Sequence, residues 1–500
     1  MNYKNGRKMG NFWLLFALIT FCSVKANASK LPPDPDNAAL LYYQAFLHQP
    51  EPDYAEEALV FNTHADKIYE LLCGGELEFH PDIEKEISEL EKSLKNGANG
   101  TDEIPSELKE MMPEQDFEWY LFSNIQSRLS ELRKRREHEK KMRGVDPNET
   151  IRSYMKECRD TIELAQAASE LPQCDWGIMY SQGLACRSPQ IAQTRPLISM
   201  LCTDALVLAA DKNYRAAFER CLMARRFAHH VCGDIGILYS VSAGGDYKVL
   251  RCIGLILGHM KPDVDTLVWL KNQLAIEKGP PASPAKVLKT EFAMVLQSLR
   301  TNSSMMEKAR QVMSMRQVLN ALEREQLTQD GGNAVDMQSL TDEELIALAG
   351  KPYATFLDSV LQVMDSEMSY EEKSSEIRRL TEEITSEFGG DPASFPMMVA
   401  QPEKLLTLSV VMFSVEPSAI YNVHVRRTAH SNALIAGIEV HLVKAKTGQL
   451  PEKLPEGVPK DPFTGKDFAY EITEEGFVLS LSDKNIPGQK LRAYEFKVKE

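Results

Sequence analysis

The sequence predicts a mainly α-helical protein, in which a solenoid-like body of helical hairpins is closed by a small C-terminal antiparallel β module. The first observation is the stretch from Leu197 to Ala228, where apolar residues recur at i, i+3, i+4 and i+7 on both sides of a polar break at 211–213. The second is the C-terminal end, where prolines crowded between 451 and 462 exclude helix and short β-type runs follow.

The predicted hairpin is the clearest element of the chain. Two amphipathic helices joined by a short polar turn pack antiparallel, and neither can bury its apolar stripe alone. We therefore expect the surrounding helices to cover that stripe. The segment 201–229 resembles one degenerate tetratricopeptide unit, with Tyr214, Ala217 and Ala224 at the helix-B positions. The Trp and Gly typical of helix A are absent, and no second copy follows at the family's repeat period of about 34 residues.

Proline, glycine and capping residues set the expected ends of the helices. Asp36 or Asn37 caps the first helix, which Pro50 and Pro52 end. The glycine-rich segment 233–245 is expected to be a turn. The other helical patterns lie at about 54–73, 81–95, 117–143, 149–171, 247–259, 262–276, 286–325, 352–387, 405–415 and 419–446. The strand-type runs lie at 468–472, 477–481 and 494–498.

These patterns and the composition divide the chain into segments of different character. The segments are 1–28 (signal peptide), 29–145 (N-terminal helical region), 146–325 (central helical-hairpin domain), 326–350 (linker), 351–446 (C-terminal helices) and 447–500 (small antiparallel β module).

The N-terminus predicts export. A basic start precedes the apolar run Phe12 to Phe21, and Ala26-Asn27-Ala28 supplies the small residues that a signal peptidase needs. That run is about half of a membrane-spanning length, which favours cleavage after Ala28 and a periplasmic or extracellular protein. Cys22 raises a lipoprotein alternative, which the bulky Phe21 before it disfavours.

Charge and hydropathy limit the kinds of partner that the protein is expected to bind. Acids outnumber bases 72 to 57, giving a net charge of −15, so we expect no nucleic-acid partner. After signal cleavage no run is long enough for a transmembrane anchor, and Leu405 to Val415 is the best that remains. The basic run 133–136 is interleaved with glutamates, which favours a solvated helix face; a peripheral contact with anionic lipid stays open as the alternative.

Eight cysteines follow the signal segment, and seven of them lie between 158 and 252. An even number in an oxidising compartment permits disulfides, and Cys174–Cys186 is the favoured pair because glycines lie in the loop between them. The alternative is that these cysteines are small apolar helix residues, as Cys221 on the hairpin stripe suggests.

Candidate binding residues come from the irregular loop 172–189, which carries Trp176 and Tyr180, and from Tyr214, His229 and His230 on the hairpin. Aromatic residues in a loop beside a helical scaffold suit a binding surface, and they equally suit a plug at the end of a helical core. Linear signatures of metal, nucleotide or hydrolase sites are missing, so we expect no metal ion and no cofactor.

The C-terminal segment resembles a module of known proteins. A helix at 432–446, then Thr447-Gly448-Gln449-Leu450-Pro451, the motif 461–466 (DPFTGK), Tyr470 and the run 476–479 resemble the C-terminal half of type II secretion major pseudopilins. The N-terminus carries no prepilin peptidase motif, so the resemblance implies a similar module outside pilus assembly.

The whole layout resembles large exported proteins of unknown function in planctomycete-type bacteria, which implies no known activity. We therefore favour a non-catalytic exported interaction or scaffold protein of the cell envelope, whose partner is another envelope protein. The alternative is an exported hydrolase, its site assembled from scattered residues near Trp176, Tyr180, His229 and His230. A deep pocket uniting either histidine with a carboxylate and a Ser or Cys would favour the hydrolase.

Overall fold

A computed structural model of the chain describes residues 37–95, 114–261, 263–276, 282–301, 340–388, 407, 410–411, 414–481 and 493–498. The expected fold class is confirmed, because helices form most of this part of the chain and three short strands form one antiparallel sheet. The predicted signal peptide, the linker before residue 340 and most of the 405–415 pattern lie outside the described residues.

The N-terminal half of the described chain consists of helices. They are α2 (Ala38–His48), α3 (Tyr54–Glu56), the π-helix η1 (Glu57–Phe61), α4 (Ala65–Leu72), α5 (Ile83–Lys95), α7 (Glu114–Met142), α8 (Pro147–Glu157), α9 (Arg159–Glu170), the 3₁₀-helix η2 (Tyr180–Ala185), α10 (Gln190–Ala210), α11 (Tyr214–Val231) and α12 (Gly236–His259).

The C-terminal half adds further helices and the sheet. They are α13 (Val264–Ile276), α14 (Pro284–Thr301), α16 (Asp342–Asp365), α17 (Tyr370–Phe388), α20 (Pro417–Thr447), β1 (Ala469–Thr473), β2 (Gly476–Ser480) and β3 (Ala493–Lys497).

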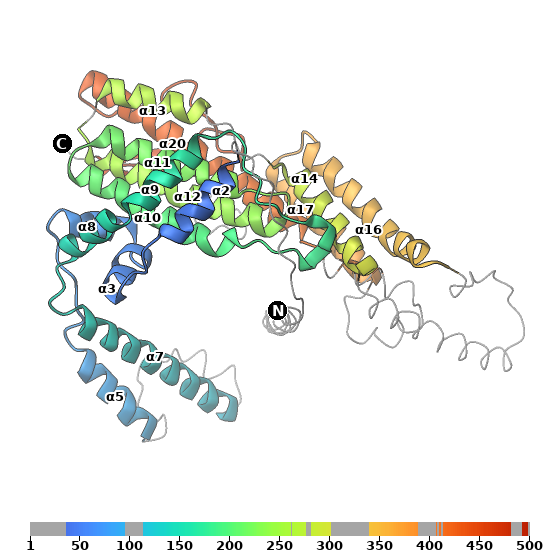
Figure 1. The fold of residues 1–500 in the computed structure, drawn as a ribbon, viewed down its shortest axis with the longest axis horizontal. Coiled ribbons are helices and arrows are strands. Elements are labelled where there is room, and N and C mark those ends of the chain that lie inside the picture. Colours follow the sequence, from blue (N-terminus) through green and yellow to red (C-terminus); the bar gives the residue numbers. More distant parts are fainter. Residues whose placement is uncertain are drawn as a thin grey trace, which may run out of the picture.

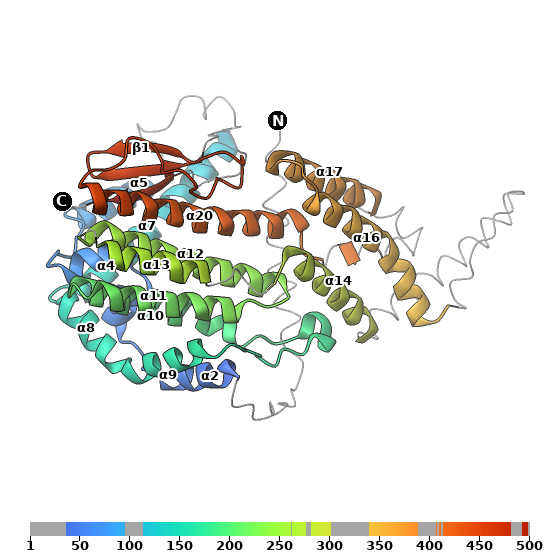
Figure 2. The ribbon, with the colours of Figure 1, turned by 90° about the horizontal axis from the view of Figure 1, so that it is seen from above.

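The body is built in layers around the predicted hairpin. Figure 2 shows the sheet lying on α20, then α12 and α13, then α11 and α10, and finally α9 with α2. Helices α14, α16 and α17 lie at one end of these layers (Figure 2). One continuous core of buried apolar side chains runs through the layers, so the neighbouring helices cover the hairpin stripe as expected.

The hairpin turn has a specific geometry. Lys212 adopts a left-handed φ of 63°, and the Asn213 amide donates to the Leu208 carbonyl at 2.8 Å. This is the Schellman arrangement, which satisfies the last carbonyls of α10 and reverses the chain within the three residues 211–213. The polar break in the pattern is therefore a helix cap followed at once by the next helix.

Helices α5 and α7 project from the body as a separate pair (Figure 1). Ile83, Ile87 and Leu129 form a small core of their own between them. The basic run on α7 pairs with glutamates, for example Arg133 Nη2 with Glu91 Oε1 at 2.7 Å. The solvated-face interpretation of that run fits these pairs.

Two expected boundaries are wrong. The segment 233–245 is not a turn throughout, because α12 begins at Gly236. Gly245 instead lets α12 approach α10 closely, since a Cβ there would meet Ile198 Cδ1 at 2.4 Å. The 326–350 linker also ends early: a Thr341–Glu344 capping box starts α16 at Asp342.

The sheet has strand order β1–β2–β3, antiparallel throughout, with Phe477 opposite Phe496 in the β2–β3 register. Those two rings stack at 4.9 Å and bury the inner face of the sheet against His441 of α20. Gly437 of α20 makes room for them, because a Cβ there would lie 2.6 Å from the Phe496 ring. Within the described residues, no helix is both long and apolar enough to cross a membrane.

Candidate binding groove

Trp176, a predicted binding residue, is a core residue. Its side chain is 7% exposed and stacks with Tyr42 and Phe46 of α2 at ring distances of 5.7 and 6.2 Å. The indole Nε1–H donates to the His230 carbonyl at 2.6 Å, which satisfies its one donor. The loop 172–189 could form a binding surface or a plug at the end of the helical core, and the position of Trp176 supports the plug.

The two predicted tyrosines lie far apart. Tyr180 begins η2, where its half-buried hydroxyl lies against Gly233 and burial raises its pKa. Tyr214 begins α11, and its hydroxyl donates to the His259 carbonyl at 3.2 Å. Tyr214 is therefore at the opposite end of α11 from the two histidines, and the structure does not bring the five predicted residues into one site.

His230 joins the aromatic plug, since its Nδ1 lies 3.0 Å from the Tyr42 hydroxyl. Burial lowers the pKa of His230 to about 4, so the ring is neutral at pH 7. His229 faces the other way, with Nε2 at 3.6 Å from Asp246 Oδ1. Burial also lowers the pKa of His229.

Asp246 lies at the centre of a buried ion cluster. Arg225 Nε donates to Oδ1 and Arg427 Nε to Oδ2, both at 2.9 Å, and Arg427 also donates to Ser242 at 3.2 Å. Burial alone would raise the pKa of Asp246, but His229 and the two guanidiniums lower it overall. The Asp246 side chain is 1% exposed. The cluster thus brings together a His, a carboxylate and a Ser, as the hydrolase alternative requires, but α11, α12 and α20 close it to substrate.

The predicted Cys174–Cys186 disulfide is not formed. All eight cysteines within the described residues are free thiols, and both members of that pair are half-buried. Cys221 and Cys252 are in sulfur contact instead, at 3.8 Å between two fully buried side chains in packed helices. These thiols therefore act as small apolar packing residues of the central helices. In the part of the chain that the structure describes, His, Cys, Asp and Glu nowhere gather in a group of three or more suited to a metal ion.

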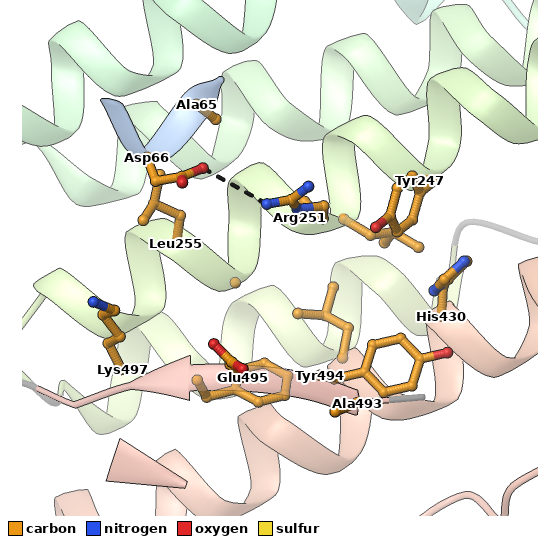
Figure 3. A pocket seen from close by; sticks show the side chains of 14 residues that line it. Ala65, Asp66, Tyr247, Arg251, Leu255, His430, Ala493, Tyr494, Glu495 and Lys497 are labelled. Atoms are coloured by element: carbon orange, nitrogen blue, oxygen red, sulfur yellow. Dashed lines mark ion pairs between the residues drawn. The ribbon is translucent and has the colours of Figure 1, made fainter. Parts of the chain in front are cut away.

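A groove of about 360 Å³ lies elsewhere, between the sheet and the helices (Figure 3). One wall is β3, the opposite wall is α12 with the start of α4, and α20 closes one end. Its volume lies in the range of small binding pockets. The lining residues are Ala65 and Asp66 of α4; Tyr247, Leu250, Arg251, Gly254 and Leu255 of α12; His430 and Leu434 of α20; and Ala493, Tyr494, Glu495, Phe496 and Lys497 of β3.

The groove has an aromatic end and a charged rim. At the aromatic end, the His430 ring lies 4.3 Å from the Tyr247 ring and 5.3 Å from the Tyr494 ring. On the rim, Arg251 pairs with Asp66 at 3.6 Å and Lys497 pairs with Glu475 at 2.9 Å. Apolar side chains line the floor of the groove between the aromatic end and the charged rim.

Two groups at the aromatic end, His430 and Tyr494, have shifted pKa values that keep them uncharged at neutral pH. Burial lowers the pKa of His430 to about 4 and raises the pKa of Tyr494 well above its usual range. The buried His430 Nδ1 has no hydrogen-bond partner among the described residues. This end of the groove is therefore suited to an apolar or aromatic group with one polar contact, and neither His430 nor Tyr494 has a pKa near 7.

Sequence reasoning missed the groove because its walls are far apart in the chain. The available signal was the pair Gly254 and Gly258 in α12, two residues that weaken a helix unless something packs closely there. In the structure, a Cβ at Gly258 would lie 2.5 Å from the Lys497 carbonyl of β3.

In comparisons with known proteins, no family model, no curated protein and no solved structure matches the chain. The pseudopilin-like and planctomycete-type resemblances stay predictions from the sequence.

Proposed function

We propose that the chain is an exported, non-catalytic binding protein of the bacterial cell envelope, which holds another envelope protein at the groove between α12 and β3. The groove carries this proposal, because it is concave, lined mainly by apolar and aromatic side chains, and rimmed by a few charged groups. General acid–base catalysis at neutral pH needs a group with a pKa near 7, and His430 and Tyr494 are shifted away from that value in opposite directions.

The features of the N-terminal segment support export. They predict cleavage after Ala28, so the protein recovered from the producing cells is expected to begin at Ser29. Mass spectrometry of the N-terminal peptide checks this. Recovery of the intact Met1 terminus from the cytoplasm would contradict the proposed location in the cell envelope. It would not affect the proposal that the groove binds a partner.

The pseudopilin-like resemblance includes the end of α20, Tyr470 of β1 and most of β2, and β3, the next described strand, is a wall of the groove. Under the proposal, this C-terminal module is the docking part of the molecule and the helical body is its support. A peripheral contact of the exposed α7 side chains with anionic lipid is compatible with this arrangement.

Site-specific photocrosslinking tests the binding site. A photoreactive phenylalanine analogue replaces Glu495 on the groove rim, and the matched control carries it at Ile237, an exposed residue at the other end of α12. We expect a discrete crosslinked product in the producing cells from position 495 and none from position 237.

Equal products from both positions, or from neither, would contradict the proposed site. Turnover of simple ester or peptide substrates by the purified protein, lost in a His229→Gln variant that still folds, would favour the hydrolase instead.

A further inference from the structure

One edge of β3 is unpaired within the described residues. β3 bonds to β2 alone, and the Val498 amide donates to the Glu475 carbonyl at 2.7 Å, just beyond the strand. In an antiparallel ladder every second residue bonds to the neighbouring strand. Because the main chain of Val498 bonds at the end of β2, the main chains of Tyr494 and Phe496 also bond to β2. The main-chain N–H and C=O groups of Ala493, Glu495 and Lys497 therefore point to the opposite, unpaired edge.

The groove runs along that edge. Successive side chains of a strand point to opposite faces, so a pocket over one face would contact every second residue. The groove instead contacts all five residues of β3, and α12 follows the strand on its far side from Tyr247 to Leu255 (Figure 3). It therefore offers outward main-chain donors and acceptors beside an apolar floor.

We infer that the groove binds an extended, basic peptide segment of the partner, which adds to the free edge of β3 as a further strand. This inference rests on the proposed function and names the chemistry of its partner. The outward N–H and C=O of Glu495 supply main-chain hydrogen bonds, and alternate side chains of the peptide enter the groove. An apolar or aromatic side chain fits the end formed by Tyr247, His430 and Tyr494.

Charge argues for a basic segment. The rim cations Arg251 and Lys497 already pair with Asp66 and Glu475. The exposed Glu495 carboxylate makes no ion-pair contact within the described part of the chain, and Lys497, two residues along the strand, interacts with it only at longer range while pairing directly with Glu475. A Lys or Arg directly opposite Glu495 on the added strand would pair with it, and the net charge of −15 attracts basic partners generally.

The same observations disfavour a second copy of this chain. Edge-to-edge pairing of two β3 strands centred on Glu495 would place two carboxylates directly opposite one another, which is destabilising. The Gly258 backbone of α12 also lies against the Lys497 carbonyl, so a helix closes one end of the edge. A single extended segment can enter there more readily than the edge of another folded sheet.

Peptide selection tests the inference. A phage library of random dodecapeptides is selected on the mature chain 29–500, and the enriched peptides are synthesised with and without N-methyl groups on alternate residues. Two protein variants accompany the wild type. Glu495→Pro removes the outward N–H and spares the ladder to β2, whereas Glu495→Gln removes the charge alone.

We expect enriched peptides to carry a basic and an aromatic residue. Glu495→Pro and N-methylation in one alternating phase should each weaken binding at least about tenfold, and N-methylation in the other phase should leave it nearly unchanged. Glu495→Gln should weaken only the basic peptides. The N-methyl series keeps the test decisive even if Glu495→Pro does not fold.

Three results would overturn the inference. They are equal binding by both N-methyl phases, no enrichment of peptides on the wild type over Glu495→Pro, and a dimer of the mature chain that Glu495→Pro dissociates. Each would leave a position-specific crosslink at residue 495 standing, so a failure of strand addition is distinguishable from a failure of the proposed function.

Discussion

Asp246 accepts bonds from two buried guanidiniums, and Arg427 Nη2 has no further partner among the described residues. Removing the carboxylate charge leaves two cations in a closed core, which is costly because the desolvation of both is no longer offset. We predict that Asp246→Asn lowers the free energy of unfolding by about 3–5 kcal/mol, measured by urea denaturation.

Asp204 provides the matched control. It pairs with a single, less buried arginine, Arg220, at 2.7 Å, and burial raises its pKa despite that pair. The protein therefore already disfavours the charged form of Asp204, and Asp204→Asn should cost about 1 kcal/mol or less. Equal losses from the two variants would show that the Asp246 cluster does not stabilise the core in this way.

Buried histidines predict the acid response of the molecule. Burial lowers the pKa of His230, His430 and His441 to about 4 in the folded state, from about 6.5 in the unfolded chain. The unfolded state binds more protons between those values, so stability present above pH ~6.5 is lost progressively as the pH falls toward ~4. The lowered pKa of Asp246 extends the loss below pH ~4.

His441 offers a test of this linkage, because its ring packs edge-on against both Phe477 and Phe496 and the residue is 2% exposed. His441→Phe keeps a ring there without a titrating group. Urea unfolding at pH 7 and pH 4 should show a loss for the wild type that is smaller in the variant by up to about 3 kcal/mol. A wild-type stability that is flat between those pH values would refute the assignment.

At the scale of single residues, the sequence predicts helix-capping residues well and binding-site residues poorly. The sequence predicts Asp36 or Asn37 as the cap of the first helix, and in the structure the Asn37 side chain accepts from the Ala39 amide at 3.1 Å. Capping depends on neighbours in the chain, so local pattern is enough. Trp176 was placed on a candidate surface because it lies in a loop, but α2 covers that loop from a distant part of the sequence.

Helix α12 allows a matched test of how the sheet docks. Gly258→Ala places a methyl group against the Lys497 carbonyl, a backbone atom that cannot move aside without shifting β3. We predict a destabilisation of about 1–3 kcal/mol, measured by thermal or urea unfolding. Gly244→Ala on the same helix meets nothing within 4 Å, so it should stabilise by up to about 1 kcal/mol through helix propensity. Stabilisation by both would mean that β3 does not pack on α12 as described.

At the scale of elements, helical periodicity predicts the hairpin, and the short β-type runs after the proline-rich span predict all three strands to within one residue. The predicted start of α12 is wrong because glycines close together in a sequence also indicate a turn. In the structure, Gly245 serves close packing of two helices, and the partner side chain Ile198 is far away in the sequence. A local pattern cannot separate these two uses of glycine.

At the scale of the molecule, the fold class follows from local signals, but the groove does not. Its walls are α12, ending at His259, and β3, beginning at Ala493, and no pattern within either segment indicates that they meet. The layered body places them together because the sheet needs an apolar support, which α20 and α12 provide.

Residue-resolved hydrogen–deuterium exchange of the mature protein measures directly whether β3 has an open edge that a partner strand can cover. We expect the Glu495 amide to exchange faster than those of Tyr494 and Phe496, which bond to β2, and to become protected when a selected peptide is bound. Equal protection of all three amides in the free protein would show that the edge is already covered and would exclude strand addition there.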